Sequence, residues 1–494
     1  MNALAFVPRA PSIGFAALAS LGSGGPALGN PVVSPGAEAI YSSRTNTWRI
    51  DGTTAAPVES SPRTSRGTCS WTFSPNVRAH PPISGQVIWP DIEVSADGTI
   101  GVAWMDDRTF SYHVYYSAST DGGLGWSPPE QVDTRLGGNL SCFPDLEFDP
   151  SGTPVVVWED DRQGSGGMNV YVSRRTGGMP PWSPNVKVND GGTPPSVTDF
   201  MNPSIAVLDE TRFYVAWTDW REGVLHQVYS SRTTSAGTSW SAAVRVSDGL
   251  GFEPVAGDPS IAVDPASSPA SAALICLTND WRGFAPGGRY PNVYAYRSTD
   301  GGASWSIGVQ VNDVTPFYQQ VTGHSIVVLD DGTRVAGWFN SPAAGQDHLH
   351  TNVSTDGGAT WSGSVQADHA GTGVYPSIAK DGAWVYAGYD TYESGWNVYF
   401  RASADGGRTW TEAPCRVDDD ATGAASQNAV VAVGPLSEAC LVWQDSRPGF
   451  GTWKAYTSCG VHQSTAIDGF AAMSSGAVGQ IRCSPNPSLA GSSV

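Results

Sequence analysis

The chain repeats one order of apolar and polar positions at intervals of roughly 50 residues, the length of a propeller blade. Residues 90–126 show this order, with "PDIEVSADGTIGVAWMDDR" followed after a short loop by "HVYYSASTDGGLGW". An alternating segment is followed by a short turn, an apolar segment, a polar loop, a second alternating segment and a glycine turn. Alternation with period two, broken by turn signals every ~8–12 residues, predicts four antiparallel strands per unit.

One four-stranded sheet cannot bury both of its faces, but copies stacked around an axis can. The repeat therefore predicts an all-β fold, a β-propeller of four-stranded antiparallel blades. First strands begin near 90, 144, 203, 259, 324, 376 and 428, which gives seven blades, with six as the alternative. The last unit lacks its fourth strand, and "TCSWTFSPNVRA" at 68–79 resembles such a strand. We expect the N- and C-terminal segments to share one sheet, because this closes the ring and removes open edges.

Composition narrows the class of protein. Gly (58) and Pro (36) are abundant among the 494 residues, and the net charge is −19. This charge argues against a nucleic-acid partner, because phosphate binding needs a basic surface. No stretch approaches the ~20 apolar residues of a membrane span. We expect a monomer without a cofactor, although the acidic ends of the fourth strands leave a structural calcium ion open.

The ends of the chain differ from the repeat. Residues 1–29 form a candidate signal peptide with a small apolar run after Arg9, and a loose tail is the alternative. Residues 30–67 are rich in Pro, Ser, Thr and Gly, and the predicted propeller spans 68–459. Residues 460–494 contain a linker, and "SPNPSLAGSSV" resembles the start of a C-terminal β-sandwich used for sorting in secreted bacterial proteins. We therefore expect a secreted or cell-surface location.

The glycine turn is repeated with the pattern Ser-x-Asp-x-Gly-x-x-Trp, the Asp-box. The chain resembles the sialidase superfamily of BNR-repeat proteins in this pattern, over about residues 68–459. An Asp side chain accepts hydrogen bonds from N–H groups of its own turn, and Gly permits positive φ, so these turns are predicted to be structural. The four complete copies contain Asp121, Asp300, Asp356 and Asp405. The resemblance implies that they lie on the face opposite the active site.

A second repeated word is an Asp–Arg pair after the second strand of five blades, which we interpret as fixing the loop because charge-assisted pairs commonly hold loops. The predicted pairs are Asp107/Arg108, Asp161/Arg162, Asp219/Arg221, Asp280/Arg282 and Asp445/Arg447.

Seven cysteines show no metal-ligand spacing. Aligned on blade one, Cys69 and Cys459 flank the place of one hairpin turn, so we predict a Cys69–Cys459 disulfide, with free thiols as the alternative. Cys276 and Cys440 lie in apolar strands and are expected in the core.

Function is expected where equivalent positions differ between blades. The residue before each first strand lies at the inner mouth of the ring. Aromatic, amide, carboxyl and imidazole groups together suit a sugar, whose ring faces stack while its hydroxyls form hydrogen bonds, although they could instead plug the hole. These residues are Trp89, Phe143, Asn202, Asp258, His324, Tyr375 and Gln427.

The resemblance to sialidases implies roles for some of these residues. Tyr375 stands where sialidases place a nucleophilic Tyr, and Glu253, with Asp258 behind it, is the candidate base. Sialidases also grip a carboxylate with three arginines, and this chain has Arg49 without the expected Arg-Ile-Pro word, besides Arg221 and Arg282.

Three functions remain open from the sequence. The first is binding of an extracellular glycan or glycoprotein at the axial mouth. The second is a sialidase-type exo-glycosidase, and the third is a scaffold for protein interactions.

Overall fold

A computed structural model describes most of the chain. The described residues are 39–42, 47–50, 69–134, 140–162, 167–191, 201–221, 226–249, 256–280, 291–313, 320–341, 348–369, 372–393, 395–420, 423–447 and 452–463. Within these ranges, every regular element is a β-strand. The described part of the chain contains no helix with the length and apolar character that a membrane crossing requires.

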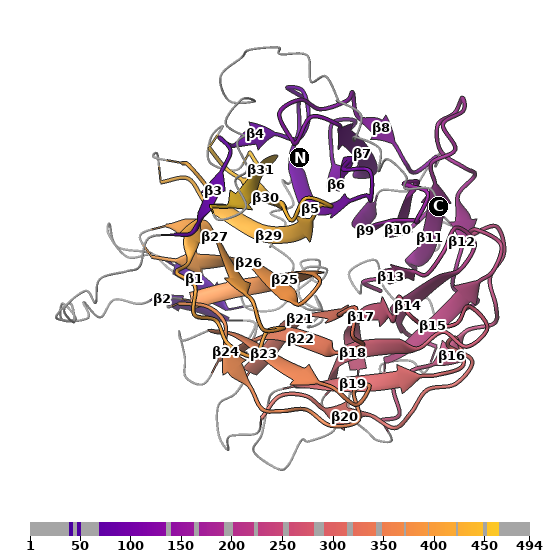
Figure 1. The fold of residues 1–494 in the computed structure, drawn as a ribbon. Helices are drawn as coiled ribbons and strands as arrows, with labels where there is room; N and C mark the ends of the chain where they lie inside the picture. The colour runs from indigo at the N-terminus through magenta and orange to yellow at the C-terminus, as the bar shows by residue number, and fades with distance from the viewer. Residues whose placement is uncertain are drawn as a thin grey trace, which may run out of the picture.

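Seven sheets stand around a central axis as the blades of a propeller (Figure 1). Blade 1 contains β5 (Val87–Val94), β6 (Ile100–Asp106), β7 (His113–Ser119) and β8 (Glu130–Gln131). Blade 2 contains β9 (Ser141–Phe148), β10 (Pro154–Asp160), β11 (Asn169–Arg174) and β12 (Val186–Lys187). Blade 3 contains β13 (Ser204–Val207), β14 (Phe213–Asp219), β15 (Gln227–Thr233) and β16 (Val244–Arg245).

The next three blades repeat this antiparallel order. Blade 4 contains β17 (Ala256–Val263), β18 (Leu274–Asp280), β19 (Asn292–Ser298) and β20 (Val309–Gln310). Blade 5 contains β21 (Gln320–Val328), β22 (Arg334–Ser341), β23 (His348–Ser354) and β24 (Val365–Gln366). Blade 6 contains β25 (Thr372–Asp381), β26 (Trp384–Tyr392), β27 (Trp396–Ser403) and β28 (Cys415–Arg416). A separate hairpin joins β1 (Ala39–Ser42) to β2 (Thr47–Ile50).

Blade 7 closes the ring with strands from both ends of the chain. It contains β29 (Ser426–Val433), β30 (Ala439–Asp445), β31 (Lys454–His462), β3 (Trp71–Phe73) and β4 (Val77–Arg78). Trp71 lies opposite His462, and Arg78 lies opposite Tyr456, so both N-terminal strands pair with β31. The predicted closure and the count of seven blades are confirmed, and the six-bladed alternative is wrong.

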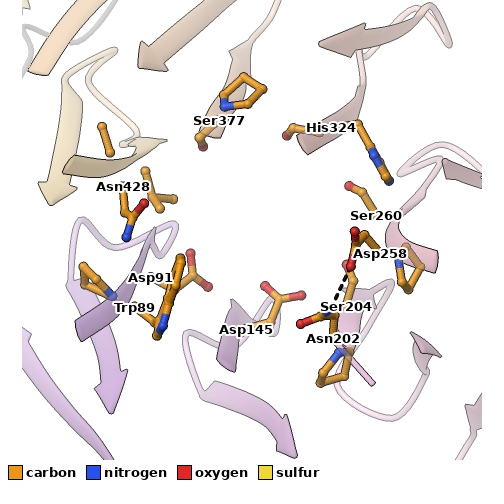
Figure 2. A pocket seen from close by; sticks show the side chains of 17 residues that line it. Trp89, Asp91, Asp145, Asn202, Ser204, Asp258, Ser260, His324, Ser377 and Asn428 are labelled. Carbon is orange, nitrogen blue, oxygen red and sulfur yellow. Dashed lines mark hydrogen bonds between the residues drawn. The ribbon is translucent and has the colours of Figure 1, made fainter. Parts of the chain in front are cut away.

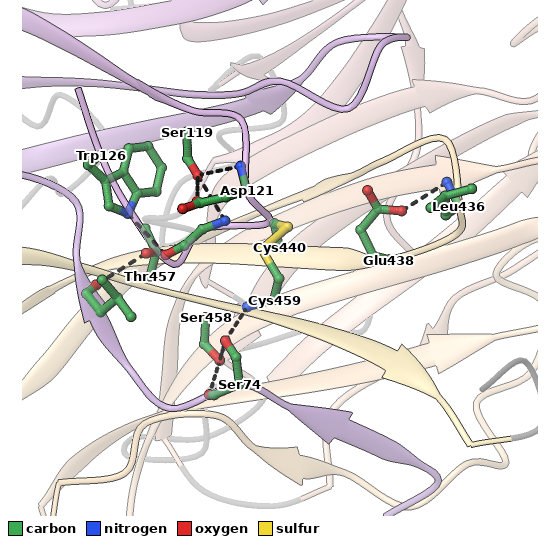
Figure 3. Close-up of a disulfide and its surroundings, with 12 residues drawn as sticks. Ser74, Ser119, Asp121, Trp126, Leu436, Glu438, Cys440, Thr457, Ser458 and Cys459 are labelled. Atoms are coloured by element: carbon green, nitrogen blue, oxygen red, sulfur yellow. Dashed lines mark hydrogen bonds between the residues drawn. A yellow bond between two sulfur atoms is a disulfide. The ribbon is translucent and has the colours of Figure 1, made fainter. Parts of the chain in front are cut away.

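The disulfides differ from the prediction. Cys69 bonds Cys415 in the outer strand of blade 6, and Cys440 bonds Cys459 across β30 and β31. The predicted Cys69–Cys459 bond is wrong because β3 pairs with residues 460–462, which leaves Cys69 beyond the end of that ladder. Cys459 lies directly opposite Cys440 instead, beneath the glycine turn of blade 1 (Figure 3). Cys276 is buried and free, as expected of a core residue.

The core lies between neighbouring blades. Second strands are buried on both faces, which is why their sequences are continuously apolar. In five blades the second strand carries a Trp with no exposed surface, at Trp104, Trp158, Trp217, Trp338 and Trp443. A buried Trp removes a large apolar area from water, so these residues hold adjacent blades together.

The Asp at the end of the second strand accepts hydrogen bonds from both a Trp indole and an Arg guanidinium. Trp104 Nε1 donates to Asp106 at 2.8 Å, Arg108 Nε donates to the same carboxylate at 2.8 Å, and the Arg108 guanidinium lies 3.8 Å from the Tyr115 ring centroid. Matching groups occur at Trp158/Asp160/Arg162, Trp217/Asp219/Arg221 and Trp443/Asp445/Arg447.

The predicted loop pairs Asp219/Arg221 and Asp445/Arg447 are confirmed, whereas two others are shifted by one residue. Arg108 pairs with Asp106 rather than Asp107, and Arg162 pairs with Asp160 rather than Asp161. The second Asp in each case accepts a hydrogen bond from a backbone N–H just before the first strand, Gln86 N for Asp107 and Leu140 N for Asp161.

The glycine turns have the expected local hydrogen bonds. Ser119 Oγ donates to Asp121 at 2.8 Å, the Asp121 carboxylate accepts from Gly125 N at 2.8 Å, and Gly123 (φ +85°) donates to Ser119 Oγ. Asp300, Asp356 and Asp405 accept the same kind of backbone N–H bonds. Because β7 runs antiparallel to β6 and hence in the direction of β5, this turn lies on the face where β5 ends, opposite its start at Val87.

Candidate functional site

The first strand of most blades is interrupted by a two-residue bulge near its start. In β5 the pairing with β6 passes from Ile88 to Asp91 and skips Trp89 and Pro90. Proline has no N–H to contribute to a ladder, so an x-Pro pair favours this break. In four blades the residue before this proline takes a positive φ, as does Asn428 before Ala429 in blade 7, and this lets the chain turn into the axial space. Positive φ occurs at Trp89, Phe143, Asn202, Asp258 and Asn428.

The second strand of the preceding blade holds several bulges in place. Trp89 N donates to Gln444 of blade 7 at 3.4 Å, and Asp258 N donates to Thr218 of blade 3 at 3.1 Å. A non-glycine residue at positive φ is strained by about 1–3 kcal/mol. Such strain persists only where the surroundings over-determine the conformation, and it concentrates at binding sites.

These bulges surround a pocket of ≈ 230 Å³ on the propeller axis (Figure 2). All seven blades contribute residues to its lining, and blade 2 contributes Asp145 alone. The lining residues are Trp89, Pro90, Asp91, Asp145, Asn202, Pro203, Ser204, Asp258, Pro259, Ser260, His324, Ser325, Pro376, Ser377, Asn428, Ala429 and Val430.

Hydrogen bonds between adjacent blades form much of the wall of the pocket. In five blades the lining residue near the start of the first strand accepts from a backbone N–H of the next blade: Asp91 accepts from Leu146 at 2.7 Å, and Asp145 from Ile205 at 2.8 Å. Ser204, Ser325 and Ser377 make the corresponding bonds to Ile261, Ile378 and Val431. The equivalent residue in blade 7 is Val430, whose side chain has no acceptor for the next blade. The Ile92 N–H of blade 1 donates instead to Asp91 of its own strand. The side chains of the wall are therefore fixed by the closed ring.

Four carboxyl groups gather on the inner strands of blades 1 and 2. Asp91 and Glu93 lie two residues apart on β5, and Asp145 and Glu147 lie two residues apart on β9, so each pair shares one side of its strand. Burial, together with the charge of Asp145, raises the pKa of Asp91 well above its usual value and raises the pKa of Glu93 to about 8. Burial and the charge of Glu93 also raise the pKa of Glu147. These shifts favour the protonated form of the three carboxyls.

Asp258 is the carboxylate on the opposite side of the pocket. Asn202 Nδ2 donates to it at 2.6 Å (Figure 2), and Asn279 Nδ2, outside the lining, donates to its other oxygen at 3.4 Å. Two amide donors from two blades thus fix the orientation of one carboxylate.

Asn428 lies on the same side of the pocket as Asp91 and Trp89 (Figure 2). Its backbone is clamped, because both oxygens of buried Asp390 accept from Asn428 N at 2.6 Å and Ala429 N at 3.0 Å. The side chain is 4% exposed, yet neither its Oδ1 nor its Nδ2 has a hydrogen-bond partner. A buried polar group without a partner costs about 1–3 kcal/mol, so this amide is suited to a ligand that supplies the missing bonds.

The predicted mouth residues are distributed unequally. Trp89, Asn202, Asp258 and His324 line the pocket. Phe143 is outside it and packs edge-on against Trp89, with ring centroids 5.4 Å apart. Both rings are buried, at 6% and 7% exposure, so Trp89 forms wall and is not an open stacking platform.

Two mouth residues were assigned one position away from their structural equivalents. In blade 7 the positive φ and the lining position belong to Asn428, not Gln427, which pairs with Gln444 in the ladder. In blade 5 the pairing skips a single residue, so His324 takes the place that proline has in other blades. Both blades lack the x-Pro word, so the alignment had no marker there. The Asn before a small residue, with its tolerance of positive φ, was the available signal.

The structure describes only some of the residues for which the resemblance to sialidases implied a role. Tyr375 lies in β25 at the bulge between Val374 and Ser377, but its side chain is outside the part that the structure describes. Glu253 and Arg282 also lie outside the described residues. Arg221 bonds Asp219 at 2.7 Å and Asp190 at 2.9 Å, so its guanidinium already has two carboxylate partners.

The chemistry of the described lining is acidic and neutral. Its ionisable groups are three carboxyls and one imidazole, and no Arg or Lys is among the lining residues that the structure describes. Within the same ranges, no group of three or more His, Cys, Asp or Glu side chains is arranged to hold a metal ion.

Comparisons with known proteins agree with the fold. The BNR repeat-like domain matches residues 227–433. A search of curated proteins found no match. An ulvan lyase, described as a polysaccharide lyase, superposes with a TM-score of 0.51 at 11% identity, over 73% of this chain and 92% of the lyase. A Dyadobacter fermentans protein of unknown function superposes with a TM-score of 0.49 at 15% identity, over 79% of this chain and 99% of that one.

An α-L-arabinofuranosidase from Fusarium graminearum is similar over 70% of this chain and 98% of the enzyme, with 16% identity and a TM-score of 0.47. At 11% identity the likeness to the ulvan lyase concerns the fold alone. The chain thus folds as a seven-bladed β-propeller of four-stranded blades, and its residues 227–433 match the BNR repeat-like domain.

Proposed function

We propose that the protein is an extracellular carbohydrate-binding propeller whose ligand occupies the axial pocket. The observation that carries this proposal is the buried, unpartnered amide of Asn428 on the pocket wall. An amide offers one acceptor and two donors, which matches the donor and acceptor character of sugar hydroxyls.

Other features of the pocket support a sugar. Pockets for small ligands combine apolar walls with a few fixed polar groups. Here the prolines and Trp89 supply apolar surface, and Ser204, Ser377 and Asp258 supply oriented polar groups. The shared fold of the ulvan lyase supports the same class of ligand, because its substrate is a polysaccharide.

The two disulfides support a location outside the cytoplasm. Disulfides form and persist in oxidising compartments and are rare in the reducing cytosol. Cys69–Cys415 and Cys440–Cys459 both link strands that close the ring. Oxidation of these cysteines therefore stabilises the closed ring that forms the pocket.

Catalysis of the sialidase type has less support than binding. It requires cationic groups that grip a sialic carboxylate, and the described lining offers carboxyls in their place. A fluorogenic sialoside assay of the wild type and Tyr375→Phe tests this alternative. Turnover by the wild type that is lost in the variant would replace the binding proposal with a hydrolase.

The binding proposal is tested on a glycan array, followed by calorimetry with the strongest ligand. We expect Asn428→Gly, which tolerates the positive φ, to weaken binding by about 10-fold or more, as expected for loss of hydrogen bonds worth ~1.5–3 kcal/mol. Glu210→Gln, on the exposed turn between β13 and β14 at the opposite face, is the matched control and should bind normally. Absence of any glycan ligand would favour the scaffold for protein interactions.

A further inference from the structure

Resting on the proposed function, we propose further that the axial pocket selects a sugar that carries a protonated amine over neutral and acidic sugars. The amine would sit between Asn428 and the carboxyls of Asp91 and Asp145, and the hydroxyls would face the serines and Asp258.

The first argument is the charge of the wall. Asp91 and Asp145 line the pocket from two adjacent blades, and Asp258 lines it from the other side. Glu93 and Glu147 follow Asp91 and Asp145 on the same sides of β5 and β9 and add two further carboxyls nearby. Carboxyls in a partly water-excluded site interact strongly with a cation that enters and lets them ionise, whereas this wall offers no cationic group to a uronate or sialate.

The second argument is independent of the acidic cluster. The Asn428 amide is buried at 4% exposure without a hydrogen-bond partner on either polar atom, and it lines the same side of the pocket as Asp91. An ammonium group has three donors and no acceptor. It can therefore bond the Asn428 carbonyl oxygen and carboxylate oxygens at once, while the Asn428 N–H₂ remains for a hydroxyl.

The backbone keeps this amide in place before a ligand arrives. Asp390 accepts from the N–H groups of Asn428 and Ala429 and so secures the positive φ of +58°. A binding group held in its bound position loses less conformational entropy when the ligand binds.

The pKa values of the cluster agree with a preference for a cationic ligand. Burial and repulsion between neighbouring carboxyls raise the pKa values of Asp91, Glu93 and Glu147. A bound ammonium stabilises the ionised carboxylates and releases their protons.

The volume limits the size of the recognised unit. A cavity of ≈ 230 Å³ is smaller than the ~300–1,000 Å³ typical of pockets for drug-sized ligands. It suits one monosaccharide unit of a chain whose remainder extends from the mouth.

Calorimetry with three matched oligosaccharides tests the selectivity. The ligands are trimers of glucosamine, N-acetylglucosamine and galacturonate, measured in EDTA at low ionic strength so that no metal ion bridges protein and ligand. We expect the glucosamine trimer to bind at least 10-fold more tightly than the N-acetylated trimer, and the galacturonate trimer not to bind.

Two variants locate the preference. Asp145→Asn retains an oxygen for the Ile205 N–H and removes one charge, and it should reduce the preference for the glucosamine trimer about 5-fold or more. Glu210→Gln removes one charge on the opposite face and should leave the preference unchanged. Equal or tighter binding of the neutral or acidic trimer would overturn the selectivity while glycan binding stands. No binding by any trimer or array glycan would overturn both proposals.

Discussion

The disulfide Cys69–Cys415 is expected to stabilise the protein more than Cys440–Cys459 because it closes a much longer loop. The bonded residues are separated by 346 positions in the first case and by 19 in the second. In the chain-entropy description, these loops correspond to about 6 and about 3 kcal/mol of stabilisation at 25 °C. The difference depends on the loop ratio alone and is about 2.6 kcal/mol.

The two bonds can be compared cleanly because their loops follow one another along the chain and do not overlap. The perturbation is the double variant Cys69→Ala/Cys415→Ala against Cys440→Ala/Cys459→Ala. Both members of the second pair are buried, at 0% and 5% exposure, so truncation loses more packing there. The packing term opposes the entropic one, and we expect a measured difference of about 1–2.5 kcal/mol.

Equilibrium unfolding in urea, followed by tryptophan fluorescence, measures both variants against the wild type. Hydrogen exchange in β3 provides a second readout, because Cys69 anchors the strand that completes blade 7. An equal or larger loss in Cys440→Ala/Cys459→Ala would refute the reasoning. The short cross-strand bond would then contribute through native-state contacts, not through loop closure.

Three further predictions concern the axis and the core. Because burial raises the pKa of Glu93 from 4.5 in the unfolded chain to about 8 in the folded protein, the folded state binds a proton that the unfolded chain has lost between these pH values. The free energy of unfolding should therefore fall between about pH 5 and pH 8, by up to ~1.4 kcal/mol per pH unit for each such group. Glu93→Gln should flatten this slope, as measured by urea unfolding at several pH values. Asn428→Gly should raise the free energy of unfolding of the ligand-free protein by about 1 kcal/mol, since removal of an unpartnered buried amide outweighs the added chain entropy of glycine; a loss of stability in a thermal melt would mean that the amide has partners. Asp445→Ala should cost about 2–4 kcal/mol, because it leaves the buried Trp443 indole without an acceptor and removes one of the two carboxylates that pair with Arg447, whereas Asp445→Asn should cost less; similar denaturation midpoints for the two variants would contradict this.

The architecture was readable from the sequence because its signals are local and repeated. Alternation with period two marks strands, and each copy of the Ser-x-Asp-x-Gly-x-x-Trp turn folds through contacts within a few residues, as in the bonds of Asp121 to its own turn. Repetition supplied the number of blades. The missing strand of blade 7 identified its donor at 68–79, because an unpaired edge in a ring requires a partner.

Positions that depend on register or on contacts between blades could not be read in this way. The partner of Cys69 depends on how far β3 extends along β31. The alignment placed the bulge one residue away from its true position in two blades. It therefore selected Gln427 where Asn428 lines the pocket, and it gave His324 the position before the proline although His324 stands at the proline position. An error of one residue matters because side chains change sides with every residue of a strand.

The sequence alone determined the strands, the turns, the seven blades and the closure of the ring, since these follow from periodicity and from chemistry within each repeat. Only the tertiary structure decided the pocket. Asp91, Asp145, Asp258 and Asn428 come from four blades spread over more than 300 positions, and closure of the ring brings them to one axis. Their proximity, the unpartnered amide of Asn428 and the raised carboxyl pKa values are properties of that closed arrangement, and no local pattern encodes them.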